Sequence, residues 1–195
     1  MKKLLIMSLM IMTVSCAAPE TVSLNHTLAV DYAVATYQSS TDASAFGYSD
    51  GYSGDQDVMG LSYEVREEES PVAATFGVYR TDLSLDEVEG NMTDLRVGLR
   101  YYFDDAYTFY VGSSLNKGMN FNVEDVYFKS KGFGYSLEGG KKFNLTDNLE
   151  LTAYVRYSDM PNASSKDLWT DGYSVSTIEL DSTATTAGVM LGWNF

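Results

Sequence analysis

The chain has 195 residues, with 13 basic against 27 acidic side chains for a formal net charge of −14, one cysteine and one histidine. The acidic balance argues against nucleic acid as a partner, and a single cysteine excludes an internal disulfide. No run of eighteen or more apolar residues occurs, so the sequence predicts no transmembrane helix.

Residues 1–17 have the layout of a secretory signal peptide. A basic start is followed by a short apolar run and a small-residue cleavage site that ends at Ala17. Cys16 leaves a bacterial lipoprotein as the alternative. We predict that residues 1–17 are removed and that residues 18–195 form one domain.

Eight segments alternate apolar with small or polar residues at a period of two, which indicates β-strands with two unlike faces. In the first segment Leu28, Val30 and Tyr32 alternate with Ala29 and Asp31. The predicted strands are residues 26–38, 59–66, 72–79, 95–103, 107–116, 133–143, 149–158 and 187–195.

The connections between these segments alternate in length. Long polar loops are expected at residues 39–56, 84–91, 117–130 and 159–173. Short turns are expected at residues 67–70, 104–106 and 144–148. A meander with its long loops at one end and its tight turns at the other is the plan of a transmembrane β-barrel.

Two places depart from this simple scheme. Phe121 and Phe128 suggest that strands continue through the third loop toward a turn near Glu124. Ile178 is out of register with the last strand, which predicts a bulge or a separate extension near Ser182. The fold class remains all-β, an eight-stranded antiparallel up-and-down transmembrane β-barrel.

Charge pairing indicates which face of the strands points inward. The polar face is rich in small residues and carries five acids and five bases, although the chain as a whole is strongly acidic. Charges inside a narrow, poorly hydrated lumen must be paired, whereas surface charges would share the overall excess. The predicted lumen charge network is Asp31, Glu64, Arg66, Asp94, Arg96, Arg100, Glu138, Lys142, Glu150 and Arg156.

The apolar face then points outward, toward lipid. Aromatic residues gather near strand ends, as aromatic girdles at the two membrane interfaces would require. Arg80 and Lys141 fall on this face near strand ends, where their side chains could reach lipid headgroups.

The last strand ends in Trp193, Asn194 and a terminal Phe195, and it resembles the C-terminal assembly signal of bacterial outer-membrane β-barrels. With eight strands and a charged lumen, the chain resembles the small barrels of the OmpA transmembrane domain and OmpX type. The resemblance implies insertion by the outer-membrane assembly machinery and residence in a membrane that contains lipopolysaccharide, with no single activity. The assembly-signal residues are Val189, Leu191, Trp193 and Phe195.

Catalytic and cofactor signatures are not found in the sequence. His26, the single histidine, stands at the start of the first strand on the lipid-facing parity, away from the end where external substrates would arrive. No zinc-ligand spacing, phosphate-binding loop or EF-hand spacing occurs. We therefore expect neither an enzyme nor a cofactor.

Three functions fit this pattern. The first is a monomeric outer-membrane barrel with a structural or surface-interaction role, which displays four polar acidic loops and contacts outer-membrane lipids and lipopolysaccharide. The second is a narrow channel or small-solute transporter, although an eight-stranded lumen is wide enough only for side chains. The third is a soluble periplasmic barrel that binds an apolar ligand.

Overall fold

The computed structural model describes residues 23–43, 48–85, 88–104, 106–123, 126–130, 132–160, 163–165, 168–170, 173–175 and 178–195. The expected signal peptide and the expected turn at Glu124 lie outside these residues. Every regular element in the described chain is a β-strand. No described helix is long and apolar enough to cross a membrane.

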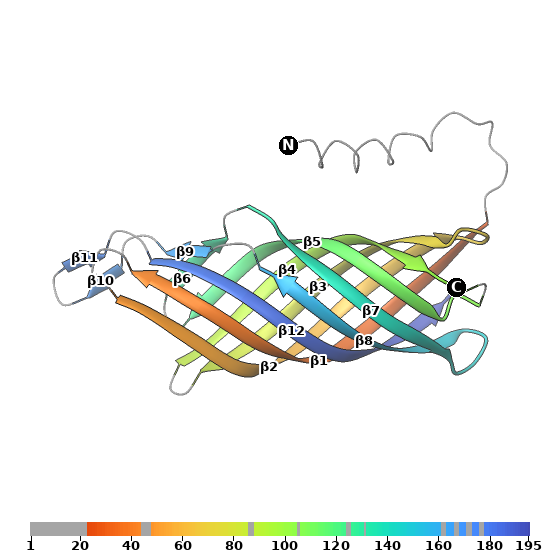
Figure 1. Ribbon diagram of the computed structural model, residues 1–195, viewed down its shortest axis with the longest axis horizontal. Coiled ribbons are helices and arrows are strands. Elements are labelled where there is room, and N and C mark those ends of the chain that lie inside the picture. Colours follow the sequence, from red (N-terminus) through yellow and green to blue (C-terminus); the bar gives the residue numbers. More distant parts are fainter. Residues whose placement is uncertain are drawn as a thin grey trace, which may run out of the picture.

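Eight long strands form the wall of the molecule, and four short ones lie near one end of it (Figure 1). The long strands are β1 Leu24–Ala43, β2 Tyr48–Glu67, β3 Val72–Leu85, β4 Val88–Tyr102, β5 Phe109–Val123, β7 Gly134–Asn144, β8 Leu149–Asp159 and β12 Ile178–Asn194. The short strands are β6 Val126–Ser130, β9 Ala163–Ser165, β10 Leu168–Thr170 and β11 Tyr173–Val175.

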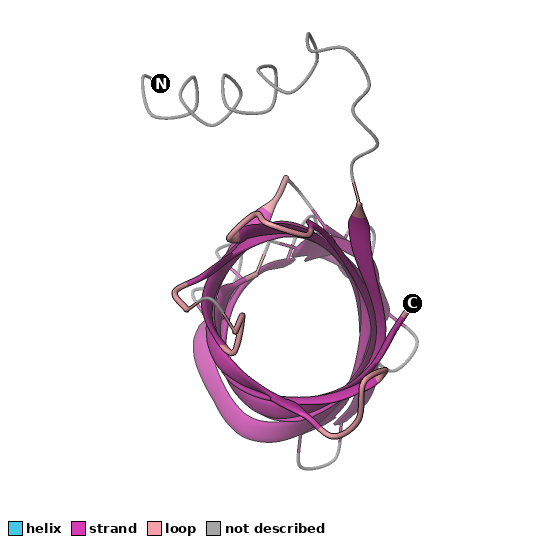
Figure 2. Ribbon diagram, turned by 90° about the vertical axis from the view of Figure 1, so that its right-hand side faces the viewer, coloured by secondary structure: helices cyan, strands magenta, loops and turns pink. Residues whose placement is uncertain are grey.

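Each long strand pairs antiparallel with the long strand that follows it, and β12 pairs with β1 to close the ring (Figure 2). At this seam Leu28 lies opposite Trp193 and Val30 lies opposite Leu191. The fold class expected from the alternating pattern, an eight-stranded antiparallel up-and-down barrel, is therefore confirmed.

The alternation in sequence becomes an alternation between lumen and exterior. In β1, Leu28 and Val30 are 51% and 60% exposed on the outside, whereas Asp31 and Ala33 are each 1% exposed inside. Period-two patterning produces this because successive side chains of a strand point to opposite faces. Apolar residues therefore coat the barrel and polar residues fill it.

Three of the expected long loops contain strands, which corrects the sequence analysis. The expected loop at residues 159–173 contains β9 and β10. Residues 39–43 and 48–56 extend β1 and β2, and the expected loop at residues 84–91 contains the ends of β3 and β4. Their composition is largely polar, and polar residues form strands readily once neighbouring strands are already in register. The continuation of strands through residues 117–130 is confirmed by β5 and β6.

Neither the bulge nor the separate extension expected near Ser182 is present, because β12 is one continuous strand. β12 pairs with β1 without a break from Glu179 to Asn194. A register shift lies instead between Thr93 and Asp94 of β4, opposite a skipped residue of β5. On the edge of β12 that faces away from β1, the pairing partner is β8 from Thr183 onward and β9 from Ile178 to Leu180. The strand itself is uninterrupted, and only its neighbour differs.

The two ends of the molecule differ. The turn end, which carries the connections at residues 68–71, 103–108 and 145–148 and the C-terminus, is a closed ring of eight strands. At the other end, β6 and β9 take the places of β7 and β8 in the wall. We name this part the extension: residues 36–43, 48–56, 83–85, 88–90, 121–123, 126–130, 163–165 and 178–182.

Candidate functional site: the ion-paired lumen

Nine of the ten charged residues expected in the lumen lie inside it and are buried. Asp94 is fully buried, and Arg156 is 3% exposed. They come from five different strands, β1, β2, β4, β7 and β8, so the closed ring alone brings them together. The nine are Asp31, Glu64, Asp94, Arg96, Arg100, Glu138, Lys142, Glu150 and Arg156.

Arg100 and Glu138 form the centre of a continuous chain of ion pairs. Arg100 Nη1 lies 2.8 Å from Glu64 Oε2, and Arg100 Nη2 lies 2.8 Å from Glu138 Oε1. Arg156 contacts the other oxygen of Glu138 and lies 3.8 Å from Asp31 Oδ2. The chain thus crosses the lumen from β1 to β2 by way of β8, β7 and β4.

Lys142 continues this chain to the seam of the barrel. Its ammonium group lies 2.9 Å from Glu64 Oε1 and 3.0 Å from Glu150 Oε1. Asn194 donates a hydrogen bond of 3.2 Å to Glu150 and accepts one of 2.6 Å from Thr27. The network therefore connects β12 with β1 inside the lumen, at the place where the ring closes.

Three tyrosines complete the coordination of the carboxylates, and the sequence analysis missed them. The hydroxyls of Tyr102, Tyr110 and Tyr154 each donate a bond of 2.7 Å, to Glu64, Glu138 and Asp31 respectively. Their position on the polar parity of their strands was the available signal. A tyrosine fits there because a buried hydroxyl needs a partner that a carboxylate supplies.

Glycines on neighbouring strands make room for these rings. A Cβ atom at Gly140 would stand 2.6 Å from the Tyr110 hydroxyl oxygen, and one at Gly188 would stand 2.7 Å from that of Tyr154. Each ring thus lies flat against the opposite backbone. Large and small side chains are matched across strands, as a narrow barrel interior requires.

Tyr79 links the remaining pair of charges to the network. Arg96 pairs with Asp94, and its guanidinium lies 4.2 Å from the centre of the Tyr79 ring. The guanidinium of Arg156 lies 5.0 Å from the same ring. Cation–π contacts of this kind stabilise a buried cation without adding charge.

Arg66 differs from the sequence expectation and forms no ion pair among the described residues. It lies at the turn end, where its guanidinium donates to the backbone carbonyls of Glu67, Glu68 and Ser70. It also lies 3.6 Å from the centre of the Tyr107 ring. Arg66 fastens the 68–71 turn because the carboxylates deeper in the lumen are already paired with Arg100 and Lys142.

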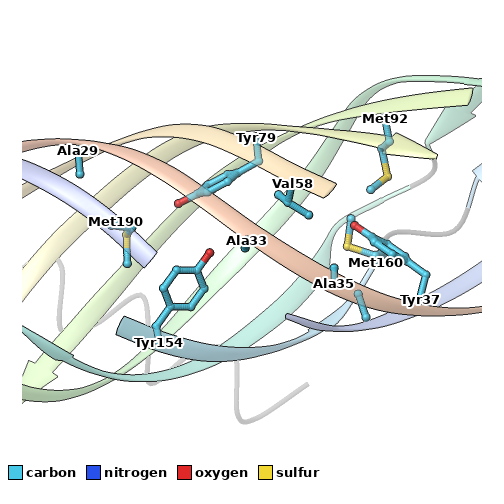
Figure 3. Close-up of a cluster of buried hydrophobic side chains, with 11 residues drawn as sticks. Ala29, Ala33, Ala35, Tyr37, Val58, Tyr79, Met92, Tyr154, Met160 and Met190 are labelled. Atoms are coloured by element: carbon cyan, nitrogen blue, oxygen red, sulfur yellow. The ribbon is translucent and has the colours of Figure 1, made fainter. Parts of the chain in front are cut away.

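The lumen nearer the extension is filled by neutral side chains. Tyr37, Met92 and Met160 lie together there (Figure 3). Val58 is 1% exposed, and the Tyr37 hydroxyl lies 3.1 Å from that of Thr81. Apolar and hydroxyl groups here replace the ion pairs of the turn-end half.

Two cavities adjoin the charged network. One of about 30 Å³ lies in mid-lumen beside Arg96, Arg100 and Arg156, where it offers room for a few water molecules. The other, about 420 Å³, is a vestibule at the turn end, and its lining includes Glu64, Lys142 and Glu150. The ion pairs therefore separate the vestibule from the middle of the lumen.

The assembly-signal residues expected in the last strand point outward. Val189, Leu191, Trp193 and Phe195 are 44%, 48%, 55% and 67% exposed. The ring of Phe195 stacks on His26, with ring centres 5.7 Å apart. The outer face of β12 is therefore apolar from Ala187 to Phe195.

His26 lies on the outside of the barrel and hydrogen-bonds the Tyr63 hydroxyl through Nδ1. Its ring stacks on Tyr63 as well as on Phe195. Among the described residues, no group of three or more histidine, cysteine or acidic side chains is arranged to hold a metal ion.

The two exterior cations expected at headgroup level differ in their partners. Lys141 lies 4.6 Å and 5.0 Å from the ring centres of Phe109 and Phe143, near the turn end. Arg80, near the extension, pairs with Asp82 at 2.9 Å. Each lies at one margin of the apolar surface.

Comparison with solved structures identifies the architecture. Neisserial surface protein A superposes with a TM-score of 0.55 at 17% identity, covering 84% of this chain and 95% of that one. The outer membrane protein OprG from Pseudomonas aeruginosa superposes with a TM-score of 0.58 at 13% identity, covering 89% and 97%. No protein-family profile and no curated sequence matches the chain.

Proposed function

We propose that this chain, which has the fold of the small eight-stranded outer-membrane β-barrels, is a closed membrane anchor that presents its polar extension for interactions at the cell surface. The observation that carries the proposal is the contrast between an apolar exterior around a filled barrel and a polar strand extension at one end only.

The exterior supports residence in a membrane. Large apolar side chains on all eight barrel strands are more than two-fifths exposed, among them Val30, Leu61, Leu99 and Leu137. Exposing this apolar surface to water would cost a large amount of free energy, whereas contact with lipid removes that cost. The OprG likeness and the outward assembly-signal residues favour the bacterial outer membrane, inserted by its assembly machinery.

The interior argues against the two alternatives. A soluble barrel that binds an apolar ligand needs a sizeable apolar cavity. The mid-lumen cavity is only about 30 Å³ and adjoins three arginines, and the vestibule of about 420 Å³ is lined largely by polar groups. A channel needs a continuous path, yet the ion pairs and the neutral cluster fill successive levels of the lumen. We therefore propose a structural or surface-interaction role without catalysis or solute transport.

Membership of the outer membrane is tested by cell fractionation together with gel electrophoresis of heated and unheated samples. The expected result is recovery with the outer membrane and a mobility shift on heating. Recovery in the soluble periplasmic fraction would contradict the proposal.

The closed lumen is tested in planar bilayers. We expect no discrete conductance steps from the purified barrel. Reproducible steps that change when Arg100 is replaced by methionine would instead support the narrow-channel alternative, because that substitution opens the centre of the network.

The proposed location in the outer membrane also predicts binding partners. The outer surface would contact outer-membrane lipids, and the acidic extension would face lipopolysaccharide, with divalent cations bridging the two sets of negative charges. Removal of divalent cations by chelation is then expected to loosen the packing of the protein in native membranes. A monomer is proposed because the ring leaves no strand edge unpaired within the membrane-spanning part.

A further inference from the structure

The vestibule at the turn end contains a cation that forms no ion pair among the described residues. Arg66 lines this cavity of about 420 Å³ and is half-buried in its wall. Its Nη1 atom donates to the backbone carbonyls of Glu67, Glu68 and Ser70. The guanidinium also lies 3.6 Å from the centre of the Tyr107 ring. The cation is therefore held in one orientation before any ligand arrives.

The other edge of this guanidinium is open to a ligand. Nε and Nη2 of Arg66 donate to no group among the described residues. Their two N–H groups are parallel, and they match the two oxygens of a carboxylate. Arg96 uses the same edge, because its Nε and Nη2 donate to the two oxygens of Asp94. Arg66 thus offers to a ligand the edge that Arg96 uses for a carboxylate of the chain itself.

The carboxylates that line the vestibule do not occupy this edge. Glu64 and Glu150 both pair with Lys142. Asp147 has no partner within the described part of the chain, and it lies in the 145–148 turn between β7 and β8, across the ring from β2. An external anion can therefore reach Arg66 without displacing an ion pair of the lumen network.

Side-chain amides without partners lie on both sides of the vestibule. Asn25 stands directly opposite Arg66 in the pairing of β1 with β2, so the two side chains share one face. Asn144 lines the cavity on the other side, near Asp147 in sequence. Neither amide forms a hydrogen bond with another described residue. Because an amide both donates and accepts, and a carboxylate accepts from hydroxyls, the lining suits a ligand with several hydroxyl groups.

Size and charge narrow the class of ligand. A cavity of about 420 Å³ is within the range of small-molecule pockets, roughly 300–1,000 Å³. A ligand with several negative charges would be repelled by Asp147, whereas a monoanion with hydroxyls satisfies both sides. The ion pairs of Lys142 close the inner end, so a ligand would bind without passing through the lumen.

We propose that the vestibule binds a small polyhydroxylated carboxylate, such as a sugar acid, through Arg66. The carboxylate accepts from Nε and Nη2, and the hydroxyl groups bond Asn25, Asn144 and Asp147. This inference goes beyond the proposed surface role, because it concerns the end of the barrel away from the extension.

The experiment uses the purified full barrel in detergent micelles and isothermal titration calorimetry with three probes. Gluconate has both a carboxylate and hydroxyls. Sorbitol has the same hydroxylated chain without the carboxylate, and propionate has the carboxylate without the hydroxyls. We expect gluconate to bind, sorbitol and propionate to bind at least ten-fold more weakly, and gluconate affinity to fall as salt is raised.

Variants of the vestibule place the binding. Arg66→Gln should weaken gluconate binding at least ten-fold, and Arg66→Lys should restore part of it because the charge returns without the paired N–H groups. Arg80→Gln is the matched control, since it removes the same charge from the exterior near the extension, and it should leave binding unchanged. A heat-shifted gel band shows that each variant is folded.

A second variant blocks the cavity without touching the cation. Ala106 lines the vestibule and is exposed, so Ala106→Trp fills space there and should also weaken gluconate binding. Lactobionate, which is gluconate with a galactose attached, distinguishes the sources of the ligand. Tighter binding than gluconate assigns the site to the end unit of a glycan, and equal or weaker binding assigns it to a free sugar acid.

Three results would overturn the inference. They are no binding of gluconate at millimolar concentration, binding of sorbitol or propionate as tight as that of gluconate, and gluconate binding that neither Arg66→Gln nor Ala106→Trp weakens.

Discussion

The two halves of β2 experience opposite environments within one strand. From Asp57 to Arg66 it is paired on both edges, with Met59 and Leu61 exposed outside and Val58 and Glu64 buried inside. From Tyr48 to Asp55 its ladder pairing is with β1 alone, in a sequence of serine, glycine, aspartate and tyrosine. Closure is thus complete where lipid would leave backbone groups without partners, and incomplete where water supplies them.

This difference indicates which interactions stabilise the barrel and which stabilise the extension. The barrel depends on a full ring of hydrogen bonds and on buried ion pairs that tolerate no missing member. The extension contains none of the buried ion pairs of the lumen network among its described residues, and backbone pairing runs along its strands. Perturbations of the lumen should therefore cost far more stability than perturbations of the extension.

Removing the central cation should give the largest effect. Arg100→Met leaves Glu64 and Glu138 each short of a buried partner, and we expect a loss of about 3–5 kcal/mol in the free energy of unfolding. The control is Arg80→Met, which breaks a pair that is more than half exposed and should cost at most about 1 kcal/mol. Urea unfolding in lipid vesicles, followed by tryptophan fluorescence, measures both; equal losses would contradict the proposed role of the network.

Substitutions at two adjacent glycines distinguish the effect of side-chain packing in the lumen from the effect of strand propensity. Gly140→Ala puts a Cβ 2.6 Å from the Tyr110 hydroxyl oxygen and 2.7 Å from two carbons of its ring, and it should destabilise the barrel by about 1–3 kcal/mol. Gly139→Ala points outward and meets only the Tyr110 carbonyl oxygen at 3.9 Å, so its effect should be near zero or slightly stabilising. The same unfolding assay checks both, and adding Tyr110→Ala should relieve the Gly140→Ala loss if the clash is its cause.

Shortening the extension should leave the barrel intact. Replacing residues 40–51 by a two-residue turn removes the tip of the β1–β2 hairpin, and we expect a change below about 1 kcal/mol because loop length contributes weakly to stability. The heat-induced mobility shift should persist. Loss of that shift would mean that the extension is needed to fold the ring.

Acidification should lower the free energy of unfolding slightly, through protonation of Asp104 in the 103–108 turn. The Thr108 hydroxyl, with backbone N–H groups of Thr108 and Phe109, holds the pKa of this carboxyl below its usual value. Since the unfolded pKa is about 3.9, the turn contributes stability above that pH, and the contribution is lost as pH falls through the lower folded value.

The variant Asp104→Asn tests this contribution. The difference in unfolding midpoint between wild type and variant should be constant near neutral pH and shrink in strongly acidic buffer. Thr108→Val removes the hydroxyl donor and should give part of the same change. A difference that is independent of pH would contradict the assignment.

Much of the barrel was predictable because its signal is local. Alternation at a period of two marks β1, with Leu28 and Val30 outside and Asp31 inside, and the excess of acids elsewhere identifies the balanced charges as interior. Strand ends were less predictable. Residues 48–56 have no apolar face, so no periodicity distinguishes a solvated strand from a loop.

By itself the sequence determined strand number, the inside-out arrangement and nine of the ten lumen charges, because each depends on residue type and parity within one strand. Only the tertiary structure decided that Arg66 fastens a turn, that three tyrosines bind the carboxylates, and that the wall opens beyond Asp57. These features depend on which strands become neighbours and at what height, and no single segment encodes that relation.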